Sequence, residues 1–216
     1  MHPRTEPTTH SARHGRDTLE FARLVNLSDA VFAIAMTLLV LTLDVPEVPA
    51  DELAGALAGE LPQLIAFLLS FALVANIWWQ HHKLFARLAW IDPGIVAVNM
   101  GLLGAVALVP FPTGLVGNTP TLRAAVLPFI TVFVILSLLY HWLVARAQRV
   151  GAWTEPMPPG LFPWVAGGLL VVVAMMVAAL IVAWWSPLGG LLLLAISNLP
   201  ERVLARWAPS GYDAWR

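Results

Sequence analysis

Long apolar stretches dominate this chain, and short polar segments separate them. A membrane-spanning helix needs about 20 mostly apolar residues. Six stretches meet or approach this length, at residues 24–43, 61–80, 95–116, 124–145, 161–185 and 188 to about 207. The connecting segments are short and carry Pro or Gly, which favour turns. The pattern predicts an all-α membrane protein with six transmembrane helices in each subunit.

The two ends of the chain are more polar than the region between them. Residues 1–20 contain no apolar core of the kind found in a signal peptide, so we expect a polar N-terminal tail. Residues 21–207 then form the six-helix transmembrane domain, and residues 208–216 form a short C-terminal tail. The sixth stretch is the weakest, because its apolar part ends near Leu199 and Pro200, Glu201 and Arg202 follow. The sequence is compatible with a sixth helix that crosses the membrane fully and with one that is tilted and half-buried.

Composition narrows the possible functions. The chain is 59% hydrophobic and 12% charged, whereas an ordinary soluble domain is about 25% charged, so a soluble enzyme is excluded. The net charge of −1 provides no basic field for nucleic acid, and we expect the lipid bilayer as the main partner. No Cys is present, which excludes disulfides and thiolate metal sites. Catalytic motifs are also missing from the sequence, so we expect no catalytic residues and no bound metal.

Basic residues indicate how the chain crosses the membrane. Eleven of the twelve Lys and Arg residues fall in segments on the side of the N-terminus, and only Arg123 falls on the other side. The positive-inside rule then places both termini in the cytoplasm of a multi-pass cell-membrane protein. The first outer loop contains five acidic residues and no basic one (Asp44, Glu47, Asp51, Glu52 and Glu60). This loop either concentrates cations at an outer mouth or is simply solvated.

The first span has two distinct sides. A stripe with helical spacing of three and four residues runs along one side, formed by Leu27, Ala30, Ile34, Thr37, Leu38 and Leu41. Asp29 lies about 140° away from Ile34 around the helix. An aliphatic ridge with one hydroxyl therefore faces away from the only acidic side chain within the span.

Ionisable groups within a membrane are costly and are functional candidates. The second span runs antiparallel to the first, which returns His81 or His82 to the layer of Arg23, Ser28 and Asp29. We expect these residues to form a cytoplasmic-side polar cluster, either as a structural clip or with a gating or sensing role. Further polar or aromatic residues are expected to have structural roles: Asn76 and Asn99 as bridges between helices, and Trp78 and Trp79 as interfacial anchors.

Two motifs resemble a known family. The run Arg23-Leu24-Val25-Asn26-Leu27-Ser28-Asp29 is similar to the RxxxFSD motif that opens the first helix of the transmembrane protein 175 family of potassium channels, and IWWQHHKLF at residues 77–85 resembles the end of its second helix. Leu27 stands where the family has an aromatic residue. The resemblance implies a homotetramer of six-helix subunits whose first helices line a central potassium pathway.

The resemblance also implies which residues form the pathway. The family lacks a T-V-G-Y-G filter, as this sequence does. Its constriction consists of aliphatic rings, which correspond here to Ile34, Leu38 and Leu41, and the hydroxyl associated with ion selectivity corresponds to Thr37. The implied permeant ion is K⁺, with no cofactor.

Two other functions remain open from the sequence. A proton-coupled secondary transporter would use Asp29 and the histidines as a relay, and Pro110, Pro112 and Pro128 do interrupt apolar stretches. No convincing internal repeat accompanies them, although repeats are typical of such transporters. The third possibility is a non-conducting membrane scaffold that binds partners.

Overall fold

The computed structural model describes residues 13–215 and is almost entirely helical. Within this part, six helical stretches are long and apolar enough to cross a membrane: Leu19–Thr42, Leu61–Ala86, Pro93–Asn118, Arg123–Val150, Leu161–Trp185 and Pro187–Trp207. The predicted six-span, all-α architecture is confirmed. The predicted tail at residues 1–20 lies mostly outside the described residues.

The first span changes helix type near its outer end. Helix α1 (Leu19–Leu38) begins after Thr18, whose side chain accepts a hydrogen bond from the Phe21 amide, as N-cap residues do. It continues into the 3₁₀-helix η1 (Leu39–Thr42). A loop with the short helix α2 (Leu53–Gly59) then leads to α3 (Leu61–Ala86). Before α1, strand β1 (His14–Gly15) pairs antiparallel with β2 (Trp90–Ile91).

Proline affects two later spans differently. The third span is divided into α4 (Pro93–Leu108) and α5 (Pro110–Asn118), because Pro110 has no N–H to continue the helical hydrogen bonds. Helix α6 (Arg123–Val150) instead continues through Pro128. The fifth span is α7 (Leu161–Trp185). The sixth consists of α8 (Pro187–Ala195), α9 (Leu199–Leu204) and η2 (Ala205–Trp207), followed by α10 (Tyr212–Trp215).

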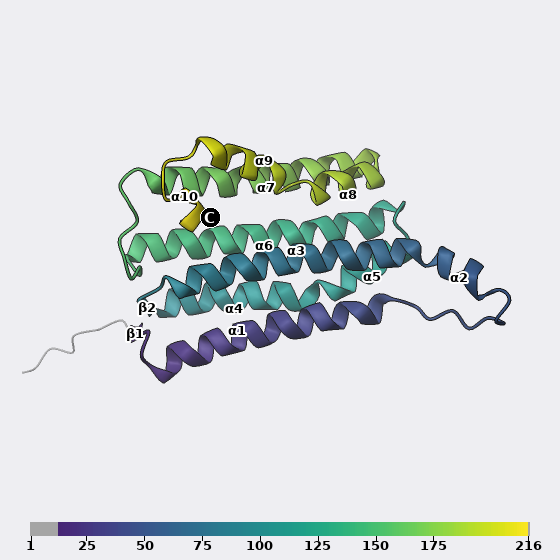
Figure 1. Ribbon diagram of the computed structural model, residues 1–216, viewed down its shortest axis with the longest axis horizontal. Coiled ribbons are helices and arrows are strands. Elements are labelled where there is room, and N and C mark those ends of the chain that lie inside the picture. Colours follow the sequence, from purple (N-terminus) through teal and green to yellow (C-terminus); the bar gives the residue numbers. More distant parts are fainter. Residues whose placement is uncertain (1–12, 216) are drawn as a thin grey trace, which may run out of the picture.

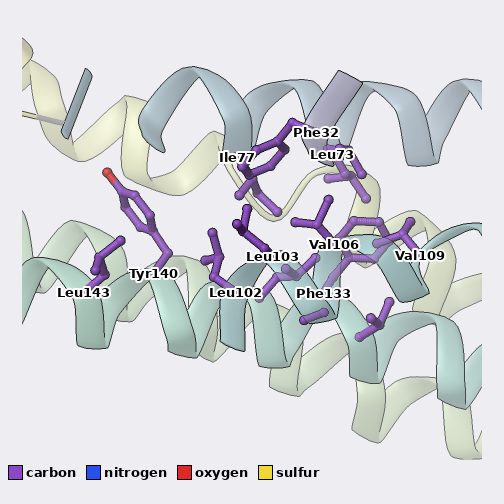
Figure 2. Close-up of a cluster of buried hydrophobic side chains, with 14 of the residues drawn as sticks. Phe32, Leu73, Ile77, Leu102, Leu103, Val106, Val109, Phe133, Tyr140 and Leu143 are labelled. Carbon is purple, nitrogen blue, oxygen red and sulfur yellow. The ribbon is translucent and has the colours of Figure 1, made fainter. Parts of the chain in front are cut away.

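The helices form a layered bundle with α1 at one edge and α7, α8 and α9 at the opposite edge (Figure 1). Helix α1 packs on α3 and α4, while α6 lies between α4 and α7. Figure 2 shows part of the apolar core, to which α1 contributes Phe32, α3 contributes Leu73 and Ile77, and α6 contributes Phe133. Strand β1 and helix α10 lie toward the same end of the bundle (Figure 1).

An ion pair fixes the start of α4 at that end. Asp92 accepts a hydrogen bond from the Ile95 amide at 2.8 Å and so caps α4, and it also pairs with Arg146 of α6. Gly94 makes room for this contact, because a Cβ at this position would lie 2.7 Å from Arg146 Nε. The ion pair thereby ties α4 to α6.

Candidate ion pathway and its polar networks

The bundle covers only one face of α1. Phe32, Ala35 and Leu39 are buried against α3 and α4. The opposite face is uncovered in the single subunit, where Ile34 is 57% exposed, Leu38 43% and Leu41 75%. The aliphatic stripe found in the sequence is therefore an outer surface of the subunit.

The change to a 3₁₀-helix keeps two of these side chains in line. Leu38 ends α1 and Leu41 lies within η1. Residues three apart eclipse each other in a 3₁₀-helix, since it has three residues per turn. Leu38 and Leu41 therefore project from nearly the same side of the helix.

Thr37 lies on this exposed face between Ile34 and Leu38. Its hydroxyl donates a hydrogen bond to the Ile34 carbonyl oxygen at 2.8 Å. The proton is therefore directed at the backbone, and the oxygen lone pairs remain available on the exposed side. Thr37 is the only hydroxyl in the exposed stripe.

A fully buried hydrogen-bond network joins the first three spans. Asn99 of α4 donates to Ser28 Oγ at 3.0 Å, and Ser28 donates to the Leu24 carbonyl at 2.8 Å. His81 Nε2 lies 2.8 Å from Asn99 Oδ1. Because a carboxamide oxygen only accepts, Nε2 must carry the hydrogen. The network links α1, α3 and α4 within an apolar layer.

A second contact holds Asp29 separately. The Trp78 indole N–H donates to Asp29 Oδ1 at 3.0 Å. His82 is exposed and its ring stacks on Trp79, with centroids 5.9 Å apart, and also contacts the Trp78 ring. Trp78 is thus a hydrogen-bond partner for an acid within the span, a role that its position near a span end did not indicate.

The expected cluster of Arg23, Ser28, Asp29 and His81 or His82 is not a single group: its members fall into these two networks, except for Arg23, which joins neither. Ser28 and His81 are joined through Asn99, whereas Asp29 and His82 lie on either side of Trp78. Arg23 is exposed and has no ion pair or hydrogen bond from its side chain within residues 13–215. The reason is rotational, since Arg23 precedes Ser28 by five residues and is about 140° away from it around the helix.

The two asparagines behave differently. Asn99 bridges three helices, as expected from the sequence. Asn76 was expected to do the same, but its side chain forms no hydrogen bond with any described residue. Within the described chain, no group of three His, Asp or Glu side chains is placed to hold a metal ion, and His81 and His82 point to different environments.

A third network fixes the outer end of the first span. Gln63 of α3 is buried, and its Nε2 donates to Asp44 Oδ2 at 2.9 Å and to Asn118 Oδ1 at 2.8 Å. Gln63 Oε1 accepts from the Asp44 amide at 2.7 Å. A Cβ at Gly117 would lie 3.1 Å from Gln63 Cα, so glycine permits this close approach. Asp44, which was counted with the acidic loop, is a structural contact that the sequence alone did not reveal.

Comparisons with known proteins agree with this architecture. Residues 23–110 match the family described as Endosomal/lysosomal potassium channel TMEM175. A potassium channel from Chamaesiphon minutus is 36% identical over 140 residues, which cover 61% of this chain and 69% of that protein. A potassium channel from Streptomyces collinus is 37% identical over 102 residues, covering 46% of this chain and 48% of that one.

The fold is also similar to a solved structure. The crystal structure of a lysosomal potassium-selective channel TMEM175 homolog from Chamaesiphon minutus superposes with a TM-score of 0.70 at 26% identity, and the match covers 88% of this chain and 98% of the other. The family match at residues 23–110 includes most of α1 and the two inner networks that hold it. Sequence and fold thus lead to the same conclusion, that this chain belongs to the TMEM175 family.

Proposed function

We propose that copies of this chain form a potassium channel in the cell membrane, with α1 of each subunit lining a shared central pathway. The observation that carries this proposal is the exposure of Ile34, Leu38 and Leu41 along one edge of the bundle. The bacterial relatives named potassium channels support the choice of ion. The function is transport and needs no catalytic residue or cofactor.

Assembly follows from the position of α1. A pathway along its exposed face is not enclosed by the other helices of the same subunit, so several copies must surround a common axis. Small exposed residues on α1, namely Ala22, Ala30 and Ala33, lie beside the large aliphatic ones. Small residues allow membrane helices to approach closely. The proposed assembly is a homotetramer, as the family resemblance implies.

The aliphatic rings act as a hydrophobic gate in this proposal. A tight ring of Ile34 cannot replace the hydration shell of K⁺, so it dewets and blocks conduction. When the α1 helices move apart, a partly hydrated ion passes. Thr37 supplies oxygen lone pairs next to the ring, and the acidic outer loop raises the local cation concentration. Selectivity without a carbonyl filter relies on few dipoles and is modest.

The two inner polar networks position the gate. Ser28, Asn99 and His81 hold α1 on α3 and α4, and Asp29 adds a second contact to α3 through Trp78. Both lie on the side of α1 that faces the bundle, away from Ile34. The basic end of the bundle, where β1 and α10 lie, is proposed to face the cytoplasm.

A flux assay on reconstituted protein tests the proposal. We expect vesicles containing the protein to pass K⁺ down its gradient without an imposed proton gradient. Ile34→Asn hydrates the constriction and should raise basal K⁺ flux by about an order of magnitude. The matched control is Ile181→Asn on α7, because Ile181 is 56% exposed but lies at the opposite edge of the bundle.

Two results would contradict the proposal. Flux that requires a proton gradient would indicate a coupled transporter. Equal K⁺ flux through the folded wild type and the folded Ile34→Asn variant would show that Ile34 does not line the pathway.

A further inference from the structure

A cavity of about 280 Å³ lies within each subunit, away from the proposed ion pathway. Helices α3, α6, α7 and α9 form its wall together with Tyr212 of α10, and none of the described residues of α1 contributes. Its wall is apolar on one side, where Leu73, Val172 and Met176 lie. The size is close to that of a small-ligand site, which is about 300 Å³ or more.

Three carboxamide side chains in the wall have no protein partner. Asn76 and Gln80 of α3 and Asn198, which precedes α9, all line the cavity, and none of their side chains hydrogen bonds to another residue in the described part of the chain. Leaving an amide unpaired inside a membrane costs several kcal/mol, on the order of 2–7. These half-buried amides are therefore available to pair with polar groups of a molecule in the cavity.

Helix α10 covers the end of the cavity that lies toward the basic end of the bundle. Tyr212 is 4% exposed, and its hydroxyl donates to Glu201 Oε1 at 3.0 Å. Gly168 of α7 permits this position, because a Cβ there would lie 2.2 Å from the Tyr212 hydroxyl oxygen. Beyond Tyr212, Trp215 packs edge-on against Trp153, with ring centroids 5.2 Å apart, and so fixes α10 on the bundle.

The exposed residues of the wall indicate where the cavity opens. Trp79 is 52% exposed and lies on α3, and Arg202 is exposed on α9. The opening therefore lies between α3 and α9, on the outer surface of the subunit at the level of the spanning helices. A ligand that enters here comes from the bilayer.

The charges in the wall favour an anionic group. Lys83 and Arg202 are cationic. Among the described residues of the wall, Glu201 is the one that is acidic. Arg202 has no ion pair or hydrogen bond from its side chain within the described residues, so its guanidinium is available. A guanidinium binds a phosphate through two parallel hydrogen bonds, and carboxamides donate to phosphate and hydroxyl oxygens.

We propose that this cavity binds the phosphate-containing headgroup of an anionic glycerophospholipid from the leaflet at the basic end of the bundle. Arg202 binds the phosphate, and Asn76, Gln80 and Asn198 bind the headgroup and glycerol oxygens. The first part of an acyl chain lies against the apolar wall and leaves past Trp79. Basic pockets between membrane helices bind anionic lipids in this way. The site is independent of ion conduction.

Binding to the delipidated, full-length protein in detergent tests this proposal. The probes are dioctanoyl phosphatidylglycerol and dioctanoyl phosphatidylcholine, measured by native mass spectrometry and by the shift in melting temperature. We expect one phosphatidylglycerol per subunit, bound about tenfold more tightly than phosphatidylcholine. Arg202→Gln should weaken phosphatidylglycerol binding by about tenfold, as expected for one charge-assisted contact.

The matched control is Arg206→Gln, which removes the same charge from η2 but lies outside the cavity wall. It should change binding by less than about twofold. A second variant, Asn76→Leu, removes one carboxamide and should also weaken binding. Melting without lipid checks that each variant is folded.

Several outcomes would overturn the proposal. Equal affinity for the two lipids would indicate only general attraction to the protein surface. The same would follow if Arg202→Gln and Arg206→Gln lost phosphatidylglycerol affinity to the same extent. Displacement of the lipid by millimolar inorganic phosphate would indicate a soluble anion as the ligand. Unchanged phosphatidylglycerol affinity in Asn76→Leu would show that the carboxamides do not bind the lipid.

Discussion

At the scale of single residues, Thr37 combines a local bond with an exposed position. Its hydroxyl hydrogen is used by the Ile34 carbonyl, which directs the oxygen lone pairs away from the helix backbone. Around a shared axis, one such oxygen from each subunit would face the ion. This arrangement provides few ligands compared with a filter of backbone carbonyls, so each oxygen matters for selectivity.

Replacing Thr37 by Ala should therefore reduce the preference for K⁺. We expect the permeability ratio of K⁺ to Na⁺ to fall by about fivefold, which corresponds to ~1 kcal/mol, as measured from reversal potentials under bi-ionic conditions. Thr37→Ser keeps the hydroxyl and should keep most of the ratio. A Thr37→Ala channel with an unchanged ratio would show that the hydroxyl has no part in selectivity.

Asp92 is a second residue whose chemistry is set by its contacts. Burial by itself favours the neutral carboxyl and raises its pKa, but hydrogen bonds from Arg146 and the Ile95 amide, with the charge of Arg146, outweigh burial and hold the pKa of Asp92 below its usual value. Because this pKa is lower in the folded chain, the carboxylate stabilises the fold above its unfolded pKa of about 3.9. The contribution is lost as the pH falls through the folded pKa.

Asp92→Asn should accordingly destabilise the protein at pH 7 by about 1–2 kcal/mol, seen as a lower melting temperature in detergent. Asn retains capping ability, so the loss reports mainly on the ion pair. The difference from the wild type should shrink as the pH falls below about 4. An exposed loop acid, Asp51, is the control, and Asp51→Asn should change neither the melting temperature at pH 7 nor its dependence on pH. A difference that persists unchanged to pH 3 would contradict this account.

At the scale of elements, the outer end of the first span is held by hydrogen bonds from another helix, α3. The helix changes from α1 to η1 at Leu39, and the short 3₁₀ segment has poorer hydrogen-bond geometry than an α-helix. Gln63 of α3 compensates with two bonds to Asp44, just beyond η1, and one to Asn118 at the end of α5. The direction in which Leu41 projects therefore depends on another span.

Gln63→Leu should loosen this end of the first span. The variant leaves the partners of Gln63 unpaired, which costs about 1–3 kcal/mol, so we expect amide hydrogen exchange in residues 39–44 to become about tenfold faster. The same substitution at Gln148, which accepts a bond from the Trp153 indole at the other end of the bundle, is the control and should not affect these amides. Unchanged exchange in Gln63→Leu would mean that η1 is stable on its own.

At the scale of the whole molecule, the edge position of α1 makes a pathway depend on other copies (Figure 1). The opposite edge, formed by α7, α8 and α9, then faces lipid. This division assigns different surroundings to two exposed side chains of the same subunit, Leu41 on η1 and Ile181 on α7.

Cysteine cross-linking distinguishes the two edges, because the natural chain has no Cys. In Leu41→Cys, oxidation in membranes should produce covalent dimers, because the proposed assembly brings residue 41 of several subunits to one axis and a disulfide forms when Cα atoms come within about 7 Å. Ile181→Cys should remain monomeric. Efficient cross-linking at Ile181 with none at Leu41 would place the wrong edge at the axis.

The sequence by itself determined the architecture of this protein. The number and approximate positions of the six spans follow from runs of apolar residues, because such a run has to cross the membrane whatever its neighbours are. The helices themselves extend beyond these runs, as α3 does to Ala86 and α6 to Val150. The split of the third span at Pro110 follows from the missing N–H. The exposed stripe on α1 also follows from periodicity, because Ile34, Leu38 and Leu41 recur with the spacing of one helix face.

Only the tertiary structure decided which polar groups meet. The antiparallel course of the first two spans placed Ser28, Asp29 and His81 in one layer, but Ser28 reaches His81 through Asn99 of a third helix, and Asp29 instead contacts Trp78. The sequence likewise did not predict the pairing of Gln63 with Asp44 or the cavity beside Asn76. Each of these contacts depends on how far one helix is rotated and shifted against another, and that is fixed by packing of the whole bundle and not by any single segment.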